Sequence, residues 1–259
     1  MKLYVKATSS YRSDREDIDI KKELKQKYSQ DTRRKDEFIN LAILGAQRLK
    51  RRVHVDEKDE LYITSGVGNI DILLKTNNYV LKNGDSVRPV DFINMLGNTT
   101  SYYVATSLHV KGKNIFQISD NFTFINTLIS IYASINSSKK DAILGCVDLV
   151  SNPSEVIKRL LHVDESCEIV SGSNYQKLSL NSKNAAASLE FDVKTYTLED
   201  IKKLEQSSTC KVLYLNRKDV FFETIISSEI NDAIESLEDV LFIEHSSNKY
   251  KILKVEVFK

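Results

Sequence analysis

The chain of 259 residues has little cysteine, histidine or proline, and the first two shortages exclude particular kinds of site. Its three cysteines are an odd number without a Cys-X-X-Cys pair, which argues against a disulfide framework and against a zinc site. No two of its four histidines have the spacing of metal ligands. Two prolines among many Lys, Asn, Ile and Ser residues indicate a biased genome composition rather than a function. We therefore expect no metal and no cofactor.

A surplus of charge and a long apolar run are also missing. The formal net charge is +1, so electrostatics give no general reason to expect binding to nucleic acid or to a membrane surface. No apolar run approaches the roughly 18 residues that span a bilayer, and residues 1–5 lack the apolar core of a signal peptide. The sequence therefore predicts a cytoplasmic protein without a membrane span.

The segment 111–148 is the most informative part of the chain. Residues 114–118 are apolar and favour a strand, and residues 122–135 form an uncharged run long enough for a helix. A helix without a charged face is normally buried on all sides. The apolar run 142–147 is typical of a strand that is covered on both faces. A strand, a buried helix and a second strand predict a layered α/β core.

This segment resembles the nucleophile region of ketosynthases of the thiolase superfamily. In that family a turn and a strand lead to a catalytic cysteine at the start of a buried helix, and a strand ending in small residues follows. The spacing matches from Gly112 to Val147 without a gap. Further matches occur in the family's order at 33–38 (RRKDEF), 62–69 (YITSGVGN), 89–94 (PVDFIN), 98–105 (NTTSYYVA) and 184–190 (NAAASLE).

The resemblance is closest to the small chain-length-factor-like proteins of aryl polyene and related polyketide clusters. It covers roughly residues 1–192, so we expect the N-terminal half of a ketosynthase-like domain there. Residues 193–259 do not resemble the C-terminal half of a ketosynthase. Two helices alternate there with strands, which predicts a short, divergent α/β segment packed on the same core. The fold class is thus expected to be a layered thiolase-like α/β fold.

On this match the family's catalytic cysteine falls on Asn121. An amide is a poor nucleophile, so acyl-enzyme chemistry has no thiolate to start from. The two patterns that carry the family's catalytic histidines, Thr-X-His-Gly-Thr and Asn-X-X-X-Gly-His, are also absent. The resemblance therefore implies no catalytic residue at the nucleophile elbow, the turn between the strand and the helix. The elbow candidates are Ser119, Asp120, Asn121, Phe122 and Thr123.

The resemblance also implies how the chain meets a partner. Subunits of that family pair through the strand before the nucleophile, which makes Ile115, Phe116, Gln117 and Ile118 candidates for a dimer interface. The residues that would face an acyl tunnel are Phe116, Ile118, Asn121, Phe122 and Phe124. The partner is expected to be a ketosynthase or a second copy of the chain. An acidic acyl carrier protein is a further candidate, which the basic residues 33–35 would attract.

Simpler interpretations stand beside these. Asn121 suits the cap of a helix as well as it suits a contact with an acyl chain. Cys146 lies in an apolar strand and is expected to be a packed core thiol. Residues 33–35 are most often a solvated face, and the glycines at 66 and 68 most simply form a tight turn.

Shorter elements are predicted from local patterns. An amphipathic helix is expected over 36–51, and a helix over 71–82 that Asn77 and Asn78 interrupt. Residues 167–171 and 176–180 are expected to be two paired strands.

The sequence as a whole favours a catalytically inactive, ketosynthase-like auxiliary subunit that associates with a ketosynthase in fatty acid or polyketide assembly. Two alternatives remain open. One is an active acyltransferase or hydrolase of the same fold with Ser119 or Thr123 as the nucleophile. The other is a homodimer with a structural role.

Overall fold

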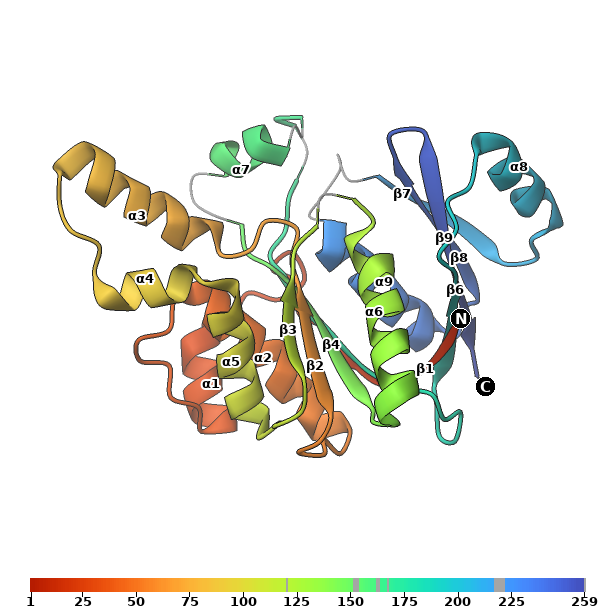
Figure 1. Ribbon diagram of the computed structural model, residues 1–259, viewed down its shortest axis with the longest axis horizontal. Helices are drawn as coiled ribbons and strands as arrows, with labels where there is room; N and C mark the ends of the chain where they lie inside the picture. Colours follow the sequence, from red (N-terminus) through yellow and green to blue (C-terminus); the bar gives the residue numbers. More distant parts are fainter. Residues whose placement is uncertain (120, 151–153, 162–163, 167, 217–221, 259) are drawn as a thin grey trace.

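The computed structural model describes the chain except residues 120, 151–153, 162–163, 167, 217–221 and 259 (Figure 1). The described strands are β1 (Lys2–Ser9), β2 (Glu60–Thr64), β3 (Asn114–Gln117), β4 (Ala142–Asp148), β5 (Gly172–Ser179), β6 (Ala187–Phe191), β7 (Lys211–Asn216), β8 (Val240–Ser246) and β9 (Lys249–Val257). The described helices are α1 (Ile20–Tyr28), α2 (Glu37–Arg52), α3 (Ile70–Asn83), α4 (Pro89–Met95), α5 (Gly97–Leu108), α6 (Thr123–Ser138), α7 (Glu155–Leu161), α8 (Leu198–Ser207) and α9 (Phe222–Ser236).

All the described strands belong to one mixed sheet, in the order β3-β2-β4-β5-β1-β6-β9-β8-β7. This order contains one pattern twice. In the first repeat, β2 runs parallel to β4, β4 antiparallel to β5, and β5 antiparallel to β1. In the second repeat, β7, β8, β9 and β6 pair with the same directions in the same succession. Because β1 and β6 pair antiparallel at the centre, the repeats are related by an approximate two-fold axis.

The second repeat is the shorter one. Four helices and β3 connect β2 to β4 in the first repeat, but α9 is the only described element between β7 and β8. Among the described strands, β3 therefore has no counterpart. The sequence analysis predicted a short, divergent C-terminal segment on the same core, and the structure confirms it. The predicted domain boundary after residue 192 stays a prediction; β6, just before it, pairs with β9 of the second repeat.

Helices cover both faces of the sheet. α1, α2 and α5 pack on one face of the first repeat (Figure 1). α6 and α9 lie side by side on the other face, and their core includes strand residues of both repeats, such as Leu144 and Phe242. α8 packs on the outer face of the second repeat through Ile201. The pair α6 and α9 thus lies between the two halves of the sheet, which confirms the predicted layered α/β fold.

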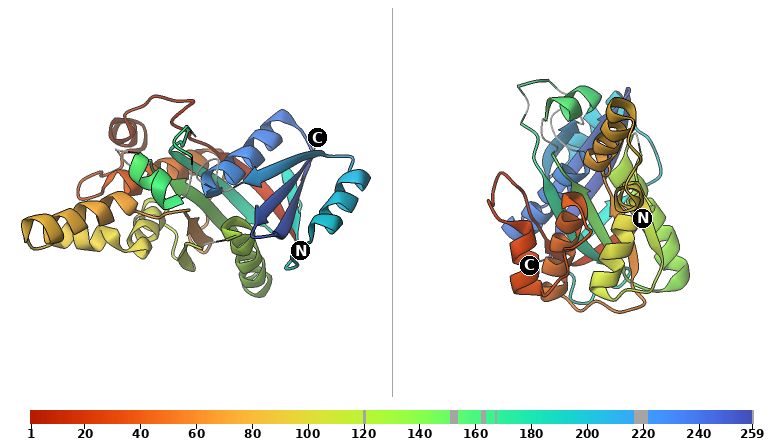
Figure 2. Two further views of the ribbon diagram at one scale, coloured as in Figure 1. Left: turned by 90° about the horizontal axis from the view of Figure 1, so that it is seen from above. Right: turned by 90° about the vertical axis from the view of Figure 1, so that its left-hand side faces the viewer.

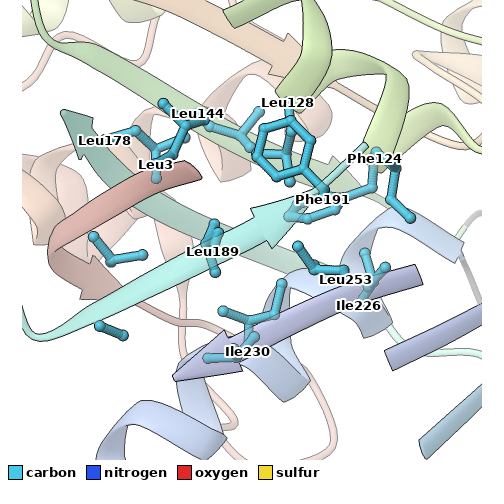
Figure 3. Packing of buried hydrophobic residues seen from close by; sticks show 14 of the residues in the cluster. Leu3, Phe124, Leu128, Leu144, Leu178, Leu189, Phe191, Ile226, Ile230 and Leu253 are labelled. Carbon is cyan, nitrogen blue, oxygen red and sulfur yellow. The ribbon is translucent and has the colours of Figure 1, made fainter. Parts of the chain in front are cut away.

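The inner core joins the two repeats. Figure 3 shows Phe124 and Leu128 of α6 near Phe191 of β6, and Ile226 and Ile230 of α9 near Leu253 of β9. The Tyr132 ring of α6 also meets Phe191 edge-on, with ring centroids 6.5 Å apart. Burying an aromatic or branched aliphatic side chain contributes roughly 1.5–3 kcal/mol, so this cluster is a main source of stability.

The prediction that the uncharged helix is buried on all sides is wrong in part. Seven residues of α6 are buried, among them Ile131 and Ile135. Ser130, Ala133 and Asn136, however, form an exposed stripe. Short polar and small side chains face water at little cost, so the absence of charge did not require burial there.

Local chemistry explains where α2 begins. The Asp36 side chain accepts the Ile39 N–H at 2.9 Å and caps the helix, and three basic residues lie in its last turn.

The predicted interruption of α3 is wrong, because Asn77 and Asn78 lie on the exposed side of a continuous helix. The predicted pair of strands at 167–171 and 176–180 is also wrong. Cys167 lies outside the described residues, and β5 is one strand that pairs with β4 and β1.

α3 and α4 together (residues 70–95) form what we call the arm. Figure 2 shows the arm extending from one end of the molecule, with α8 at the other end. α3 buries only Ile72 and Thr76. The exposed apolar residues of the arm are Leu73, Val80, Leu81, Phe92 and Ile93, each at least 43% exposed.

Candidate functional site at the elbow before helix α6

The elbow (residues 119–123) joins the edge strand β3 to α6. The Thr123 hydroxyl donates to the Ser119 carbonyl at 2.9 Å, and the Ser119 hydroxyl donates to the Asn121 carbonyl at 3.2 Å. The Asn126 side-chain amide also donates to the Asn121 carbonyl, at 3.2 Å. These bonds close the turn on itself. Asp120, one of the predicted elbow residues, lies outside the described residues.

Phe122 carries the tightest part of the turn. Its φ of 55° and ψ of 34° are left-handed, a conformation that costs a non-glycine residue roughly 1 kcal/mol or more. Its ring is buried at 8% exposure, and this packing offsets the backbone cost. Phe122, and not Asn121, is the N-cap residue of α6, and its side chain makes no capping hydrogen bond. The interpretation of Asn121 as a side-chain cap is therefore wrong.

The second repeat supplies one wall of the elbow. The Ser246 hydroxyl, at the end of β8, donates a hydrogen bond to the Asn121 side-chain oxygen. The Lys251 ammonium, on β9, donates to the Asn126 side-chain oxygen at 3.1 Å and lies 5.9 Å from the centroid of the Phe122 ring. Burial lowers the pKa of Lys251, while the charges of Glu244 and Asp192 raise it. The elbow is thus polar and contacts both repeats.

The two-fold relation places an equivalent contact at the start of α9. β4 and β8 are both seven residues long, and Asp148 ends β4 as Ser246 ends β8. The Thr224 hydroxyl of α9 donates to the Asp148 carboxylate at 2.9 Å. The end of each repeat's central strand therefore bonds the beginning of the other repeat's inner helix.

A second pair of contacts follows the same relation. Asn174 lies opposite Cys146 in the β4–β5 pairing, and Lys251 lies opposite Glu244 in the β8–β9 pairing. Cys146 is two residues before the end of β4, and Glu244 is two residues before the end of β8. The Asn174 side chain donates to the Thr224 carbonyl of α9 at 3.2 Å, as Lys251 donates to α6. We call these two sets of bonds the cross-repeat contacts.

Asp148 is the most perturbed carboxyl of this region. Complete burial raises its pKa to about 6, and hydrogen bonds from Ser65, Gly66 and Thr224 to its oxygens oppose that rise. The donors are the Ser65 hydroxyl at 2.8 Å, the Gly66 N–H at 2.9 Å and the Thr224 hydroxyl. Ser65 also accepts the Gly68 N–H at 2.8 Å, so the glycines at 66 and 68 do form a tight turn. Asp148 thus ties the end of β2 to the second repeat.

The two alternative nucleophiles have no activating base in these contacts. The hydroxyls of Ser119 and Thr123 donate to main-chain carbonyl oxygens, and Thr123 is buried. A hydroxyl nucleophile needs an adjacent group that takes its proton, which a carbonyl oxygen does not do. The geometry gives no support to acyl transfer by either residue.

The predicted tunnel residues are not brought together. Phe124 lies in the inner core, whereas Phe116 packs on the opposite face of the sheet against Phe38, with ring centroids 6.4 Å apart. Ile118 is 51% exposed. Only Asn121 and Phe122 of that set lie at the elbow.

The predicted interface residues lie together on or beside one open edge. Ile115, Phe116 and Gln117 belong to β3, which pairs only with β2 among the described strands, and Ile118 follows it. β3 therefore lies at an edge of the sheet, and pairing with another chain stays a prediction. Of the predicted basic patch, Arg33 binds Asp31 at the surface and the Lys35 ammonium lies 4.7 Å from the centroid of the Tyr103 ring.

The sequence analysis did not identify Asp148, Thr224, Ser246 or Lys251. A buried aspartate at the end of an apolar strand is a signal that could have indicated Asp148. Thr224, Ser246 and Lys251 could not be identified in this way, because they belong to the second repeat, whose strands share no recognisable motif with those of the first. Cys146 is fully buried in the inner core, as predicted.

Two other kinds of site are missing from the residues that the structure describes. In the part of the chain that the structure describes, no group of three or more His, Cys, Asp or Glu side chains is placed to hold a metal ion. Outside the gaps given above, no helix is long and apolar enough to cross a membrane.

Comparisons with known proteins identify the fold. No protein-family model matches the sequence, and no curated protein sequence matches it. Among solved structures, the ishigamide ketosynthase/chain length factor matches with a TM-score of 0.75 and 9% identity, covering 100% of both chains. The ketosynthase ApeO in complex with its chain length factor ApeC, from Xenorhabdus doucetiae, matches with a TM-score of 0.64 and 9% identity, covering 98% of this chain and 99% of that one.

A third match is a type II polyketide synthase acyl carrier protein in complex with its ketosynthase. Its TM-score is 0.68 at 10% identity, covering 99% of both chains. Sequence identities of 9–10% show a shared fold and nothing further. The chain thus has the thiolase-like ketosynthase fold that the sequence analysis predicted.

Proposed function

We propose that this chain is a catalytically inactive, ketosynthase-like auxiliary subunit of the chain-length-factor type. It would act in the cytoplasm, by associating with a ketosynthase in fatty acid or polyketide assembly. The observation that carries the proposal is the elbow. Where the resemblance puts a cysteine nucleophile, the chain has Asn121, whose side-chain oxygen accepts a hydrogen bond from Ser246. An amide held in this way offers no thiolate for acyl transfer.

The surface supports association with another chain. Among the described strands only β2 pairs with β3, so the outer edge of β3 presents main-chain groups without a strand partner, and such edges are usually paired or covered. Gly97 lies against the Phe116 ring, and Gly68 lies against Ile118. Gly68 just precedes α3 and Gly97 begins α5, so the edge strand lies beside the two ends of the arm. The arm exposes five large apolar residues, a pattern typical of an interaction surface.

The fold is compatible with the partner we propose. One of the matching structures is a ketosynthase with its chain length factor, and another is a ketosynthase with an acyl carrier protein. By analogy, the partner of this chain is a ketosynthase, and an acyl carrier protein is a further candidate. In such a pair the ketosynthase performs the acyl chemistry, and this chain contributes shape to the shared site.

Intact-mass spectrometry tests the inactive elbow. The purified chain is incubated with acyl thioesters of an acyl carrier protein, and a ketosynthase with its cysteine serves as the positive control. We expect no mass increase on the chain. An increase equal to one acyl group on Ser119, Thr123 or a cysteine would contradict the proposal.

The variant Asn121→Cys tests whether the elbow position is reachable. Asn121 is exposed, whereas Cys146 is fully buried, so the variant should react with iodoacetamide faster than the wild-type chain does. The wild-type chain measured in parallel gives the background from the native cysteines, among which Cys210 is partly exposed. Labelling no faster than wild type would mean that the elbow is closed to a substrate or a probe.

A further inference from the structure

A concave site lies beyond the C-terminal end of α6, away from the elbow. Its volume is about 530 Å³, within the range of small-molecule sites. Three segments line it: Lys6 on β1, residues 139–141 between α6 and β4, and Ser179 at the end of β5 with residues 180, 181, 183 and 184 of the loop that follows. Leu180 is the only apolar residue of its lining. We call it the basic hollow.

Positive charge dominates the basic hollow. Lys6, Lys139, Lys140 and Lys183 line it together with a single acid, Asp141, which leaves a surplus of three positive charges. The whole chain has a net charge of only +1, so this surplus is a local concentration. The C-terminus of α6 contributes roughly half a negative charge, which the two lysines that follow it more than offset.

Lys6 is directed into the hollow by an irregularity of β1. The pairing of β1 with β5 shifts register between Val5 and Ala7, so Lys6 has no partner residue in that pairing. Such bulges redirect a side chain and are common near functional sites. The Lys6 ammonium donates to the carbonyl oxygens of Asn181 and Lys183, and this fixes it against the loop. Burial lowers the pKa of Lys6, and the charge of Lys177 lowers it further, while Asp141 raises it.

Lys177, which does not line the basic hollow, partly neutralises its one acid, Asp141. The Asp141 carboxylate lies 3.5 Å from the Lys177 ammonium, which is itself buried and bound to Asp59 at 2.9 Å. Asp141 therefore repels an anion in the hollow less than an isolated carboxylate would.

The loop that carries Lys183 is held in shape by its own side chains. The Ser179 hydroxyl accepts the Asn181 N–H at 3.1 Å, and the Asn181 side chain accepts the Lys183 N–H at 2.8 Å. Asn184 follows in a left-handed conformation, with φ of 56°. A loop ordered before binding reduces the entropy that a ligand must overcome.

We propose that the basic hollow binds a small anion with several negative charges, of the polyphosphate class. Lysine ammonium groups suit phosphate oxygens as point charges with several donors each. No aromatic side chain lines the hollow, so a nucleotide base would have no ring to stack on. The hollow is independent of the elbow, and this site goes beyond the auxiliary-subunit role.

Thermal unfolding with inorganic pyrophosphate tests the site. Pyrophosphate should raise the unfolding midpoint of the wild-type chain in a saturable way, because a ligand that binds only the folded state stabilises it. Sodium chloride at matched ionic strength is the control for general screening. In Lys140→Gln/Lys183→Gln, the dissociation constant measured by calorimetry should rise roughly tenfold or more, since half of the lining lysines are gone.

The matched control is Lys202→Gln/Lys203→Gln, which removes two exposed lysines of α8 outside the hollow. This variant should bind pyrophosphate as the wild type does. The proposal is overturned if wild type shows no saturable binding, if both double variants lose affinity equally, or if acidic polyglutamate binds the hollow as tightly as pyrophosphate. None of these outcomes depends on a ketosynthase partner.

Discussion

The hydroxyl of Ser246 donates a hydrogen bond to the side-chain oxygen of Asn121, a residue 125 positions earlier in the chain. Its two-fold equivalent joins Thr224 to Asp148, 76 positions apart. Together these contacts fix the beginnings of α6 and α9 against the opposite repeat. The elbow is therefore shaped by the second repeat as much as by its own local sequence.

Removing the Ser246 hydroxyl tests this dependence. Ser246→Ala deletes one partly exposed hydrogen bond and should lower the free energy of unfolding by about 0.5–1 kcal/mol. Amide hydrogen exchange should increase at residues 121–126, because the elbow loses its contact with β8. Ser137→Ala, on the exposed end of α6, is the control and should leave both measurements unchanged within about 0.5 kcal/mol. Unchanged exchange at the elbow in Ser246→Ala would contradict the role of the contact.

Asp148 predicts a specific dependence of stability on pH. Its pKa is about 6 in the folded chain and about 3.9 when unfolded, so the folded state binds more protons between those values. The stabilisation is complete below about pH 4 and is lost as the pH rises through about 6, by an amount on the order of 3 kcal/mol.

Asp148→Asn should flatten this part of the pH profile. The amide oxygen can still accept from Ser65 and Gly66, and the Thr224 hydroxyl can turn to accept from the amide nitrogen. Urea unfolding at pH 5, 6 and 7 measures the effect, with Asp85→Asn on the surface as the control. If Asp148→Asn keeps the wild-type slope between pH 5 and 7, the assignment to Asp148 is wrong.

Two substitutions on one helix test the position of α6. Ile131 is fully buried, so Ile131→Asp should cost roughly 5 kcal/mol or more and abolish soluble folding. Ala133 lies on the exposed stripe, and Ala133→Asp introduces the same charge two residues later with a cost expected below about 1 kcal/mol. Soluble yield and circular dichroism distinguish the two variants. Tolerance of Ile131→Asp would mean that α6 does not lie in the inner layer.

Local patterns predicted the elements that local chemistry controls. Asp36 ahead of an amphipathic run and the long uncharged run after Phe122 are both visible in the sequence, and each belongs to a helix in the structure. The exposed stripe of α6 could not be predicted, because the absence of charge does not distinguish a buried serine from an exposed one. Neither could the cross-repeat contacts, because Ser246 and Asn121 meet only once both repeats of the sheet have formed.

The geometry of β3 also changes the best variant for a test of pairing. The Lys113 carbonyl accepts the Leu61 N–H at 2.7 Å, and main-chain groups alternate direction along a strand, so the Ile115 main chain faces β2. Proline at Ile115 would therefore break the internal sheet. Asn114 is exposed and its N–H points outward, so Asn114→Pro removes a group that only a partner strand would use.

Sedimentation velocity with ketosynthases of the same organism tests the auxiliary-subunit role most directly. At micromolar concentration we expect a complex of this chain with one of them. Asn114→Pro should weaken that complex by roughly tenfold or more while Asn114→Ala leaves it intact. A dimer of the chain alone that excludes every ketosynthase would favour the structural homodimer instead. A monomer under all these conditions would contradict the account.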